Sequence, residues 1–289
     1  MKSELTLRFK KAGLQTSIQD GGRYGYQSFG VTISGAMDQS AYHLANALLE
    51  NPTDCPILEI TLIGPDIEFV GQGYIVVTGG ECNPKISNIP ISINKVIKVS
   101  NGDTLSFGHF TKGCRAYLGV KGKWQCPTWL ESYAALRIAA NNFGRIRKGD
   151  LINIQNSDGI PSTASSKSIK AFLIKQEIEV MLGPEYDLFP KSSIELFFKS
   201  NYKIGLESNR IGYRLEGSKI NSPINKPLLS SAVVPGTIQI TNAGLPIILM
   251  RDAQTTGGYP RIANVISNDL DFLAQNKPGD SIKFKRKID

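Results

Sequence analysis

The sequence has few of the residues that build metal centres or nucleophilic catalytic sites. It contains only 2 histidines, far apart in the chain and without ligand spacing, which argues against a histidine-based metal site or catalytic triad. Its 4 cysteines form no CxxC pair, so we expect reduced thiols; they are Cys55, Cys82, Cys114 and Cys126. If the protein is an enzyme, its carboxylates, hydroxyls, amides and arginines must carry the chemistry.

Nucleotide-binding and membrane signals are also missing. The P-loop pattern of Gly, four residues and Gly-Lys-Ser/Thr does not occur; the nearest spacing, Gly108 to Gly113, is followed by Cys114 and Arg115. No run approaches the roughly 20 apolar residues of a membrane span. The first residues, MKSELTLRFKKAG, contain no apolar segment of a signal peptide. We therefore expect a cytoplasmic protein.

The charge of the chain is positive but dispersed. The formal net charge is +8, from 33 basic and 25 acidic residues, and 41% of the 289 residues are hydrophobic. Basic residues are not interleaved with aromatic residues, so the pattern indicates a solvated basic surface and not a nucleic-acid site. Such a surface tolerates anionic small molecules or an acidic partner.

Short strands dominate the predicted secondary structure, as in a β-barrel or sandwich. Those of the first half are Leu5–Phe9, Ile57–Leu62, Ile67–Val70, Tyr74–Thr78, Ile91–Val99, Thr104–Phe107 and Ala116–Val120. Those of the second half are Ala171–Ile174, Ile178–Leu182, Ile194–Phe198, Ile211–Leu215, Thr237–Thr241 and Leu245–Met250. The Ser-rich segment Asn156–Ser168 is the best linker candidate. We expect two β-rich halves, residues 1–160 and 169–289.

Two helices are expected in the first half. Apolar residues from Ala41 to Leu49 recur at helical spacing, and Ser34 or Asp38 could cap the start of this helix. Asn46 lies beside the apolar face, either as a boundary hydrogen-bonding residue or as a ligand-facing amide. A second short helix is expected over Glu131–Ala140.

The segment from residue 245 to residue 273 has the most unusual pattern. The apolar run to Met250 ends at Arg251 and Asp252, and Pro260 is expected to open a helix, since proline is favourable in a first helical turn. A strand, polar loop and helix N-terminus in this order can bind an anion through backbone N–H groups. The alternative is a tight connection capped by Asp252. The residues of the polar loop are Gln254, Thr255, Thr256, Gly257, Gly258 and Tyr259.

Several motifs together resemble one known family. In chain order they are Gln19-Asp20-Gly21-Gly22-Arg23-Tyr24-Gly25-Tyr26-Gln27, Ser34-Gly35-Ala36-Met37-Asp38 followed by Ala45-Asn46, Leu58-Glu59-Ile60-Thr61-Leu62-Ile63-Gly64-Pro65, Ser208-Asn209-Arg210-Ile211-Gly212-Tyr213-Arg214-Leu215-Glu216-Gly217, Pro235-Gly236-Thr237-Ile238-Gln239 and the stretch from Asp252 to Pro260. The chain resembles the carboxyltransferase-type family called KipA, also known as allophanate hydrolase subunit 2 and as the C subunit of bacterial 5-oxoprolinase.

The resemblance implies both a fold and a function. The fold would be mainly β with a few short helices, arranged as two cyclophilin-like β-barrel halves. The function would be that of one component of an ATP-dependent 5-oxoprolinase, which opens 5-oxo-L-proline to L-glutamate. The implied partners are a KipI-like protein (the B subunit of 5-oxoprolinase) and a LamB/YcsF-like protein (its A subunit). ATP with Mg²⁺ is implied at the level of the complex, whereas biotin is not expected because no biotin-carrier segment is visible.

Site roles follow from residue type and motif position. Opening an unstrained amide with ATP requires charge stabilisation, which arginines can supply. The expected catalytic residues are Asp252, Asp20, Arg210 and Arg214. The expected substrate-binding residues are Arg23, Asn46, Gln239, Gln254, Thr255, Thr256, Gly257, Gly258 and Tyr259. Alternatively, Arg210 and Arg214 form structural ion pairs with Glu216 or Asp20.

Two other functions remain open at this point. One is a regulatory protein that antagonises a KipI-like kinase inhibitor, with the polar loops as its interface. The other is a carboxyltransferase-type component that acts on a urea-derived substrate, since related sequence forms part of urea carboxylase.

Overall fold

The computed structural model describes residues 4–138, 141–157, 159–161, 175–221 and 228–287. The chain forms two compact units, the first made of residues 1–23 and 38–172 and the second of residues 24–37 and 173–289. Residues 24–37, which include the short 3-10 helix Gln27–Phe29, therefore belong to the second unit although they lie early in the sequence. This early segment carries the Ser34-Gly35 motif.

The first unit packs two β-sheets around one core. The larger sheet follows the order β11 (Lys123–Trp124), β14 (Leu151–Gln155), β1 (Glu4–Lys11), β4 (Asp66–Gly71), β9 (Thr104–Ser106), β6 (Lys85–Ile86) and β7 (Ile89–Pro90). The smaller sheet follows the order β2 (Gln15–Gln19), β3 (Ile57–Thr61), β10 (Lys112–Val120), β5 (Gly73–Glu81) and β8 (Ile97–Val99). Alternating residues of β1 point inward, and Leu5, Leu7 and Phe9 join the apolar core with Leu58 and Leu118.

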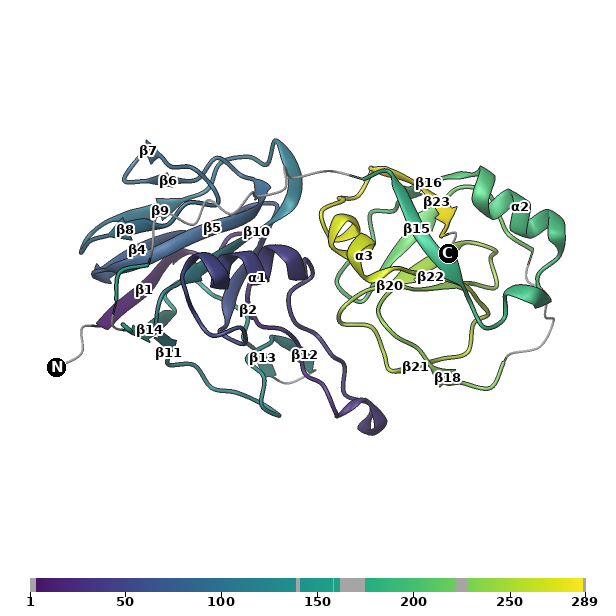
Figure 1. Ribbon diagram of the computed structural model, residues 1–289, viewed down its shortest axis with the longest axis horizontal. Coiled ribbons are helices and arrows are strands. Elements are labelled where there is room, and N and C mark those ends of the chain that lie inside the picture. Colours follow the sequence, from purple (N-terminus) through teal and green to yellow (C-terminus); the bar gives the residue numbers. More distant parts are fainter. Residues whose placement is uncertain (1–3, 139–140, 158, 162–174, 222–227, 288–289) are drawn as a thin grey trace. The chain divides into compact units, whose positions relative to one another are not determined.

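Helix α1, Gln39–Leu48, lies against β5 and β10 in the first unit (Figure 1). The Asp38 side chain accepts a hydrogen bond of 2.9 Å from the Ala41 N–H, which confirms Asp38 as its N-cap. The Asp38 N–H in turn donates to the Tyr117 hydroxyl at 2.9 Å, and that hydroxyl donates to Glu59 at 3.0 Å. The helix start is thus fixed to the sheet by a buried polar chain.

The second unit is a closed seven-stranded barrel. Its strands follow the order β15 (Glu177–Leu182), β22 (Arg261–Val265), β19 (Thr237–Ile240), β20 (Pro246–Leu249), β17 (Gly212–Glu216), β16 (Asn201–Ile204) and β23 (Ser281–Arg286). The barrel closes through parallel pairing of β15 with β23. The mainly β fold with few short helices is thereby confirmed.

Two helices and a small ribbon accompany the barrel. Helix α2, Lys191–Lys199, packs on β23, and helix α3, Ser267–Ala274, packs near β15 (Figure 1). The Phe197 ring of α2 stacks on Phe284 of β23 with centroids 4.6 Å apart. The ribbon pairs β18, Ser231–Ala232, with β21, Thr256–Gly257. None of the helices in the described ranges has the length and apolar character of a membrane span.

The prediction of a helix that begins at Pro260 is wrong. Residues Arg261–Val265 form β22, which pairs with β15 and β19, and α3 begins only at Ser267. The apolar spacing of this stretch fits a helix, but pairing on both edges buries Ile262 and Ala263 in the barrel. Consequently no helix N-terminus follows the Gly257-Gly258 loop.

Three other expectations are wrong. The expected strand Ile194–Phe198 belongs to α2, whose apolar residues pack against the barrel core. Over Glu131–Ala140 the structure contains a strand instead, β12 (Leu136–Ile138), and Glu131 itself has a positive φ that a right-handed helix does not allow. Of the expected strand Ile91–Val99, only β8 is formed.

The remaining expected strands are found with shifted ends, apart from Ala171–Ile174, which lies outside the described residues. Much of the linker candidate Asn156–Ser168 lies outside them as well. The 4 cysteines are free thiols, and Cys126 is the least buried of them.

Candidate active site

A buried ion pair joins two distant motifs in the second unit. Arg210 Nε donates to Asp252 Oδ2 and its Nη2 to Asp252 Oδ1, both at 2.8 Å. The two side chains are only 6% and 13% exposed. This is the two-pronged geometry that makes arginine–carboxylate pairs strong. The alternative prediction paired Arg210 with Glu216 or Asp20 in a structural ion pair. The structure shows such an ion pair, but its acidic partner is Asp252.

The same ion pair holds the early segment. Arg210 Nη2 donates to the Gly35 carbonyl at 2.7 Å, and Ser34 Oγ donates to Asp252 Oδ1 at 2.8 Å. The Ser34 N–H also donates to the Arg251 carbonyl at 2.9 Å. Asp252 therefore accepts three side-chain hydrogen bonds. This geometry favours a positioning role for Asp252 and Arg210, and their assignment as catalytic residues stays a prediction.

A groove of about 550 Å³ lies on the barrel and contains two of the expected site residues, Arg214 and Tyr259. We call it the Arg214 groove. It is lined by Gly205, Leu206, Glu207, Arg214, Leu215, Glu216, Thr241, Asn242, Ala243, Leu245, Pro246, Ile247 and Tyr259. Its volume lies within the range of about 300–1,000 Å³ that is typical of small-molecule sites.

The Arg214 groove combines one exposed guanidinium with two carboxylates, those of Glu207 and Glu216, and with polar and apolar walls. The Arg214 side chain is 60% exposed, and its Nε lies 3.6 Å from Glu207 Oε2. An exposed pair of this kind contributes little stability, so the guanidinium can exchange it for a ligand. A guanidinium binds carboxylate through two parallel hydrogen bonds. Tyr259 and Asn242 add hydrogen-bonding groups and Leu245 an apolar wall, so the groove offers a small carboxylate-bearing molecule one guanidinium, for which that molecule would compete with Glu207.

Gln239 supports the ribbon that carries Tyr259. Its side chain is buried, and Nε2 donates to the Tyr259 carbonyl at 3.3 Å. Gly257 of β21 lies directly against this amide, because a Cβ added there would be 2.6 Å from Gln239 Nε2. The sequence grouped Gln239, Gly257 and Tyr259 in one site, and the structure brings them together. Gln239 holds the loop from within the barrel, where it does not line the groove.

Replacement of Gly257 by alanine should therefore strain the ribbon. We expect a loss of about 0.5–1.5 kcal/mol in unfolding free energy, because the end of the Gln239 side chain must move and give up its hydrogen bond to the Tyr259 carbonyl. The double variant Gly257→Ala with Gln239→Ala should recover part of this loss relative to the sum of the two single changes. Chemical denaturation of the four proteins of this cycle measures the coupling. Strict additivity would show that the two residues do not press on each other.

The other residues of the polar loop contribute less than the sequence indicated. Gln254 and Thr256 are exposed, and the Thr255 carbonyl accepts a hydrogen bond of 3.0 Å from the Val233 N–H. Gly258 lies against the Leu228 carbonyl. Because a strand follows this loop, no helix dipole assists anion binding there, and that part of the expectation is wrong.

Asp20 and Arg23 lie in the first unit, where both are buried. Asp20 accepts hydrogen bonds from the Gly22 N–H at 2.9 Å, the Ser132 hydroxyl at 2.8 Å and the Tyr133 N–H at 2.7 Å. Arg23 donates to the carbonyls of Trp129 and Ala134 at 3.0 and 2.9 Å, and its guanidinium lies 4.9 Å from the centroid of the Trp129 ring. These contacts fix residues 129–134 to the segment that follows β2, which favours a structural role for both.

Asn46 is likewise engaged within the first unit. Its Nδ2 donates to the Cys55 carbonyl at 2.8 Å, and its Oδ1 accepts from Asn51 Nδ2 at 3.3 Å. The side chain is buried. Of the two roles left open for this residue, the geometry favours the boundary hydrogen bond.

Sequence reasoning missed a second ion pair near the ribbon, between Glu185 and Arg261. Arg261 Nε donates to Glu185 Oε2 at 2.8 Å, the Arg261 N–H donates to the same oxygen at 3.0 Å, and Nη1 donates to the Ala232 carbonyl at 2.8 Å. The hydrogen bond from Arg261 lowers the pKa of the Glu185 carboxyl. Through the bond to Ala232, Arg261 of β22 also holds β18 in place. No pattern in the sequence points to the Glu185–Arg261 pair, because its partners are 76 residues apart.

The Glu185–Arg261 pair should make stability depend on acid pH. Because the folded-state pKa of Glu185 lies below its ordinary value of 4.5, its contribution is fully present above that value and is lost as the pH falls through the lower, folded pKa. Denaturation at neutral pH and well below pH 4.5 should show Glu185→Gln as destabilising only at neutral pH. An equal loss at both would contradict this account. Glu195→Gln, at an exposed position, is the control.

The described part of the chain contains possible metal ligands and thiols. Among those residues, no group of three or more His, Cys, Asp or Glu side chains is placed to hold a metal ion. Burial raises the pKa of the Cys126 thiol to about 11, which leaves little thiolate at neutral pH.

Comparison with known proteins identifies related sequences over nearly the whole chain. The profile of the carboxyltransferase domain, subdomain A and B, matches residues 29–286. The chain is 35% identical over 281 residues to the C subunit of 5-oxoprolinase from Escherichia coli (strain K12), covering 96% of this chain and 90% of that protein. It is also 35% identical to urea amidolyase of Saccharomyces cerevisiae, covering 94% of this chain but 16% of that protein.

Solved structures show the same fold. Urea amidolyase of K. lactis superimposes with a TM-score of 0.89 at 30% identity, covering 96% of this chain and 18% of that one. The protein TTHA0988 superimposes with a TM-score of 0.88 at 24% identity, covering 97% of this chain and 55% of that one. The chain therefore corresponds to one part of these longer proteins.

Proposed function

Because the chain belongs to the carboxyltransferase domain A and B family, we propose that it is one component of an ATP-dependent 5-oxoprolinase that opens 5-oxo-L-proline to L-glutamate. The supporting observation is its match to the 5-oxoprolinase C subunits of Escherichia coli and Haemophilus influenzae over 90% and 88% of their lengths. The proposed partners are a KipI-like and a LamB/YcsF-like protein. The proposed assembly as a whole is an amide hydrolase.

The Arg214 groove is the proposed contact of this chain with the substrate. 5-Oxoproline carries one carboxylate on a small ring with one amide. The Arg214 guanidinium would take the carboxylate, and the Tyr259 hydroxyl or the Asn242 amide would donate to the ring carbonyl. Leu245 and Ile247 would cover the ring carbons. Bound in this way, the amide is held in a fixed orientation, which is the main contribution that positioning makes to a reaction.

ATP with Mg²⁺ belongs to this proposal at the level of the complex. The described residues of this chain offer neither a P-loop nor a set of three clustered carboxylates for a metal ion.

A urea-derived substrate is the second candidate. It is favoured by the similarity to urea amidolyase, which extends over 94% of this chain. A urea-derived substrate without a carboxylate would leave Arg214 without its proposed ligand. Arg214 thus separates 5-oxoproline from urea itself, whereas a carboxylated urea would also offer it a carboxylate.

Reconstitution tests the proposed function. The purified chain is mixed with a KipI-like and a LamB/YcsF-like protein, and ADP release is measured with 5-oxoproline, with urea or with neither. We expect ADP release that depends on 5-oxoproline. Dependence on urea alone would support the second candidate. A stable complex with the KipI-like protein that hydrolyses no ATP with either compound would contradict both and favour a regulatory role.

A further inference from the structure

Two opposite charges lie on one face of strand β17 in the Arg214 groove. Arg214 and Glu216 are two residues apart in this strand, both are exposed, and both line the groove. Side chains alternate between the two faces of a strand, so residues two apart point to the same side, with their Cα atoms roughly 6.6 Å apart. The groove therefore presents a guanidinium and a carboxylate side by side.

Gly205 shows where the Glu216 carboxylate lies. A Cβ added to Gly205, which lines the groove, would be 3.0 Å from Glu216 Oε1 and 3.0 Å from the Arg214 carbonyl oxygen. The Gly205 N–H donates to the same carbonyl at 2.8 Å, which places Gly205 beside Arg214 on the neighbouring strand. The Glu216 side chain thus leans back along β17 towards the position of Arg214.

Glu216 is not neutralised by a neighbouring cation. Lys203 lies directly across from Glu216 in the pairing of β16 with β17, yet within the described ranges no cation forms an ion pair with the Glu216 carboxylate. The Arg214 guanidinium is next to Glu207 instead, at 3.6 Å. A ligand carboxylate would displace Glu207, and Glu216 would still be available to an N–H or ammonium group of the same ligand.

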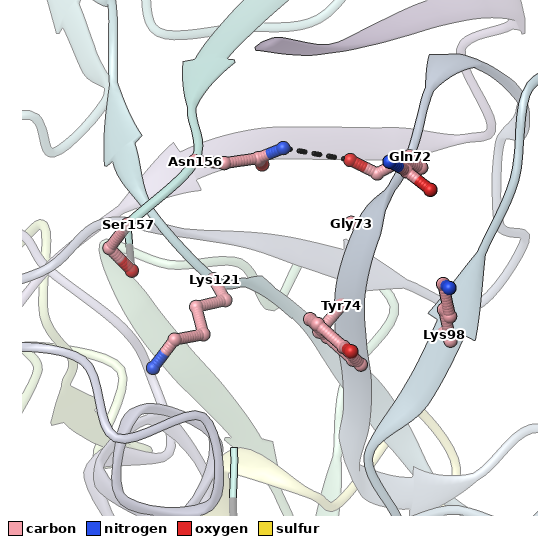
Figure 2. Close-up of a pocket in the computed structure, with 7 residues that line it drawn as sticks. All are labelled: Gln72, Gly73, Tyr74, Lys98, Lys121, Asn156 and Ser157. Atoms are coloured by element: carbon pink, nitrogen blue, oxygen red, sulfur yellow. Dashed lines mark hydrogen bonds between the residues drawn. The ribbon is translucent and has the colours of Figure 1, made fainter. Parts of the chain in front are cut away.

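A smaller cavity in the first unit, of about 170 Å³, has no comparable arrangement. Figure 2 shows Tyr74 between Lys121 and Lys98, and the Lys121 ammonium donates to the Leu49 carbonyl at 3.0 Å. The charged groups of that cavity therefore do not meet at one ligand. In the Arg214 groove, by contrast, two groups of opposite charge share one strand face.

We propose that Glu216 recognises the nitrogen beside the substrate carboxylate, which makes the Arg214 groove a site for α-amino acids; this inference rests on the function proposed above. In 5-oxoproline the ring N–H and the carboxylate are attached to the same carbon atom. A guanidinium that binds the carboxylate therefore brings the N–H to a neighbouring acceptor, and the Glu216 carboxylate is such an acceptor.

Glu216 has a stronger contact with the product than with the substrate. Hydrolysis adds one water across the ring C–N bond, which breaks, and yields the second carboxylate and the ammonium group of L-glutamate. The hydrogen bond to Glu216 then joins two charged groups in place of a neutral N–H and a carboxylate, and such bonds are the stronger kind. The groove is accordingly selective for ligands that carry an ammonium group beside the carboxylate.

Titration calorimetry on the full chain tests this proposal, alone and mixed with the two proposed partners, without ATP. The ligands are L-glutamate and glutarate, which has the same two carboxylates but no ammonium group. We expect Glu216→Gln to weaken the binding of L-glutamate by about tenfold or more, since one charge-assisted hydrogen bond is lost, and not to weaken that of glutarate. Arg214→Met should weaken the binding of both.

The matched control is Glu177→Gln. Glu177 is exposed on β15 of the same barrel and does not line the groove, so its replacement changes the net charge equally and should leave both affinities as in the wild type. Because Glu216 is exposed, Glu216→Gln should also unfold at the wild-type temperature.

The outcomes separate the role of Glu216 from the proposed reaction. Absence of L-glutamate binding by the wild type, equal affinities for L-glutamate and glutarate, or equal effects of Glu216→Gln and Glu177→Gln would overturn this role, even if the reconstituted assembly forms glutamate. Glu216-dependent binding of L-glutamate in an assembly that does not hydrolyse ATP with 5-oxoproline would support the amino-acid site and contradict the proposed reaction.

Discussion

Replacement of Asp252 by alanine should lower the unfolding free energy by about 3–5 kcal/mol, the usual cost of removing one partner from a buried ion pair. The Arg210 guanidinium would lose its two 2.8 Å hydrogen bonds to Asp252 while remaining buried. The Ser34 hydroxyl would lose its acceptor as well. The same change thus weakens the attachment of residues 24–37 to the barrel.

Chemical denaturation with a matched control measures this effect. Glu195→Ala removes the partner of Lys199 from an exposed ion pair in the same unit and should cost no more than about 0.5 kcal/mol. The double variant Arg210→Met with Asp252→Leu should recover much of the loss, because it leaves no uncompensated buried charge. A loss for Asp252→Ala that equals that for Glu195→Ala would contradict the structural importance of the pair.

Replacement of Arg214 by methionine should lower the kcat/KM for 5-oxoproline in the reconstituted assembly by about 10- to 100-fold. The magnitude rests on the loss of a charge-assisted contact of about 1.5–3 kcal/mol with the substrate carboxylate. Because the carboxylate does not react, the contact is made equally in the ground state and the transition state, so the effect should lie mainly in KM. The stability of the protein should change little, since the Arg214 side chain is 60% exposed.

The matched control for Arg214→Met is Lys285→Met. Lys285 is an exposed cation on β23 that does not line the Arg214 groove. Its removal lowers the net charge by the same amount but should leave KM unchanged. If both variants raised KM equally, the effect would come from the overall charge and not from a carboxylate bound at Arg214.

Much of the fold can be predicted from local patterns, because period-two alternation is strong in strands that have one buried face. In β15, Ile178 and Val180 are buried between exposed or half-buried neighbours, and this strand was predictable. Helix α2 was not, because its β-branched and aromatic residues also suit a strand. The prediction for β22 failed for a different reason. This strand is buried on both faces, so its sequence lacks the alternation of apolar and polar residues that marks a strand with one buried face.

The sequence predicted which residues belong to the candidate site, but it did not predict which of them contact one another. Motif resemblance selected Arg210, Asp252 and Gln239, all of which are buried or nearly so at defined contacts. The decisive pairings are long range: 42 residues separate Arg210 from Asp252, and 218 separate Ser34 from Asp252. A single sequence does not contain such pairings. It also could not tell that Arg214 is open to a groove whereas Arg210 is enclosed by hydrogen bonds.

The most direct test of the central proposal is the formation of L-glutamate from 5-oxo-L-proline and ATP. It is measured for this chain together with its KipI-like and LamB/YcsF-like partners, and for the same mixture in which Arg214→Met replaces the wild-type chain. We predict glutamate formation that requires all three proteins and that falls steeply with the variant at low substrate concentration. Glutamate formation at the same rate without this chain would contradict the proposed function, and an unchanged rate with Arg214→Met would contradict the proposed substrate contact.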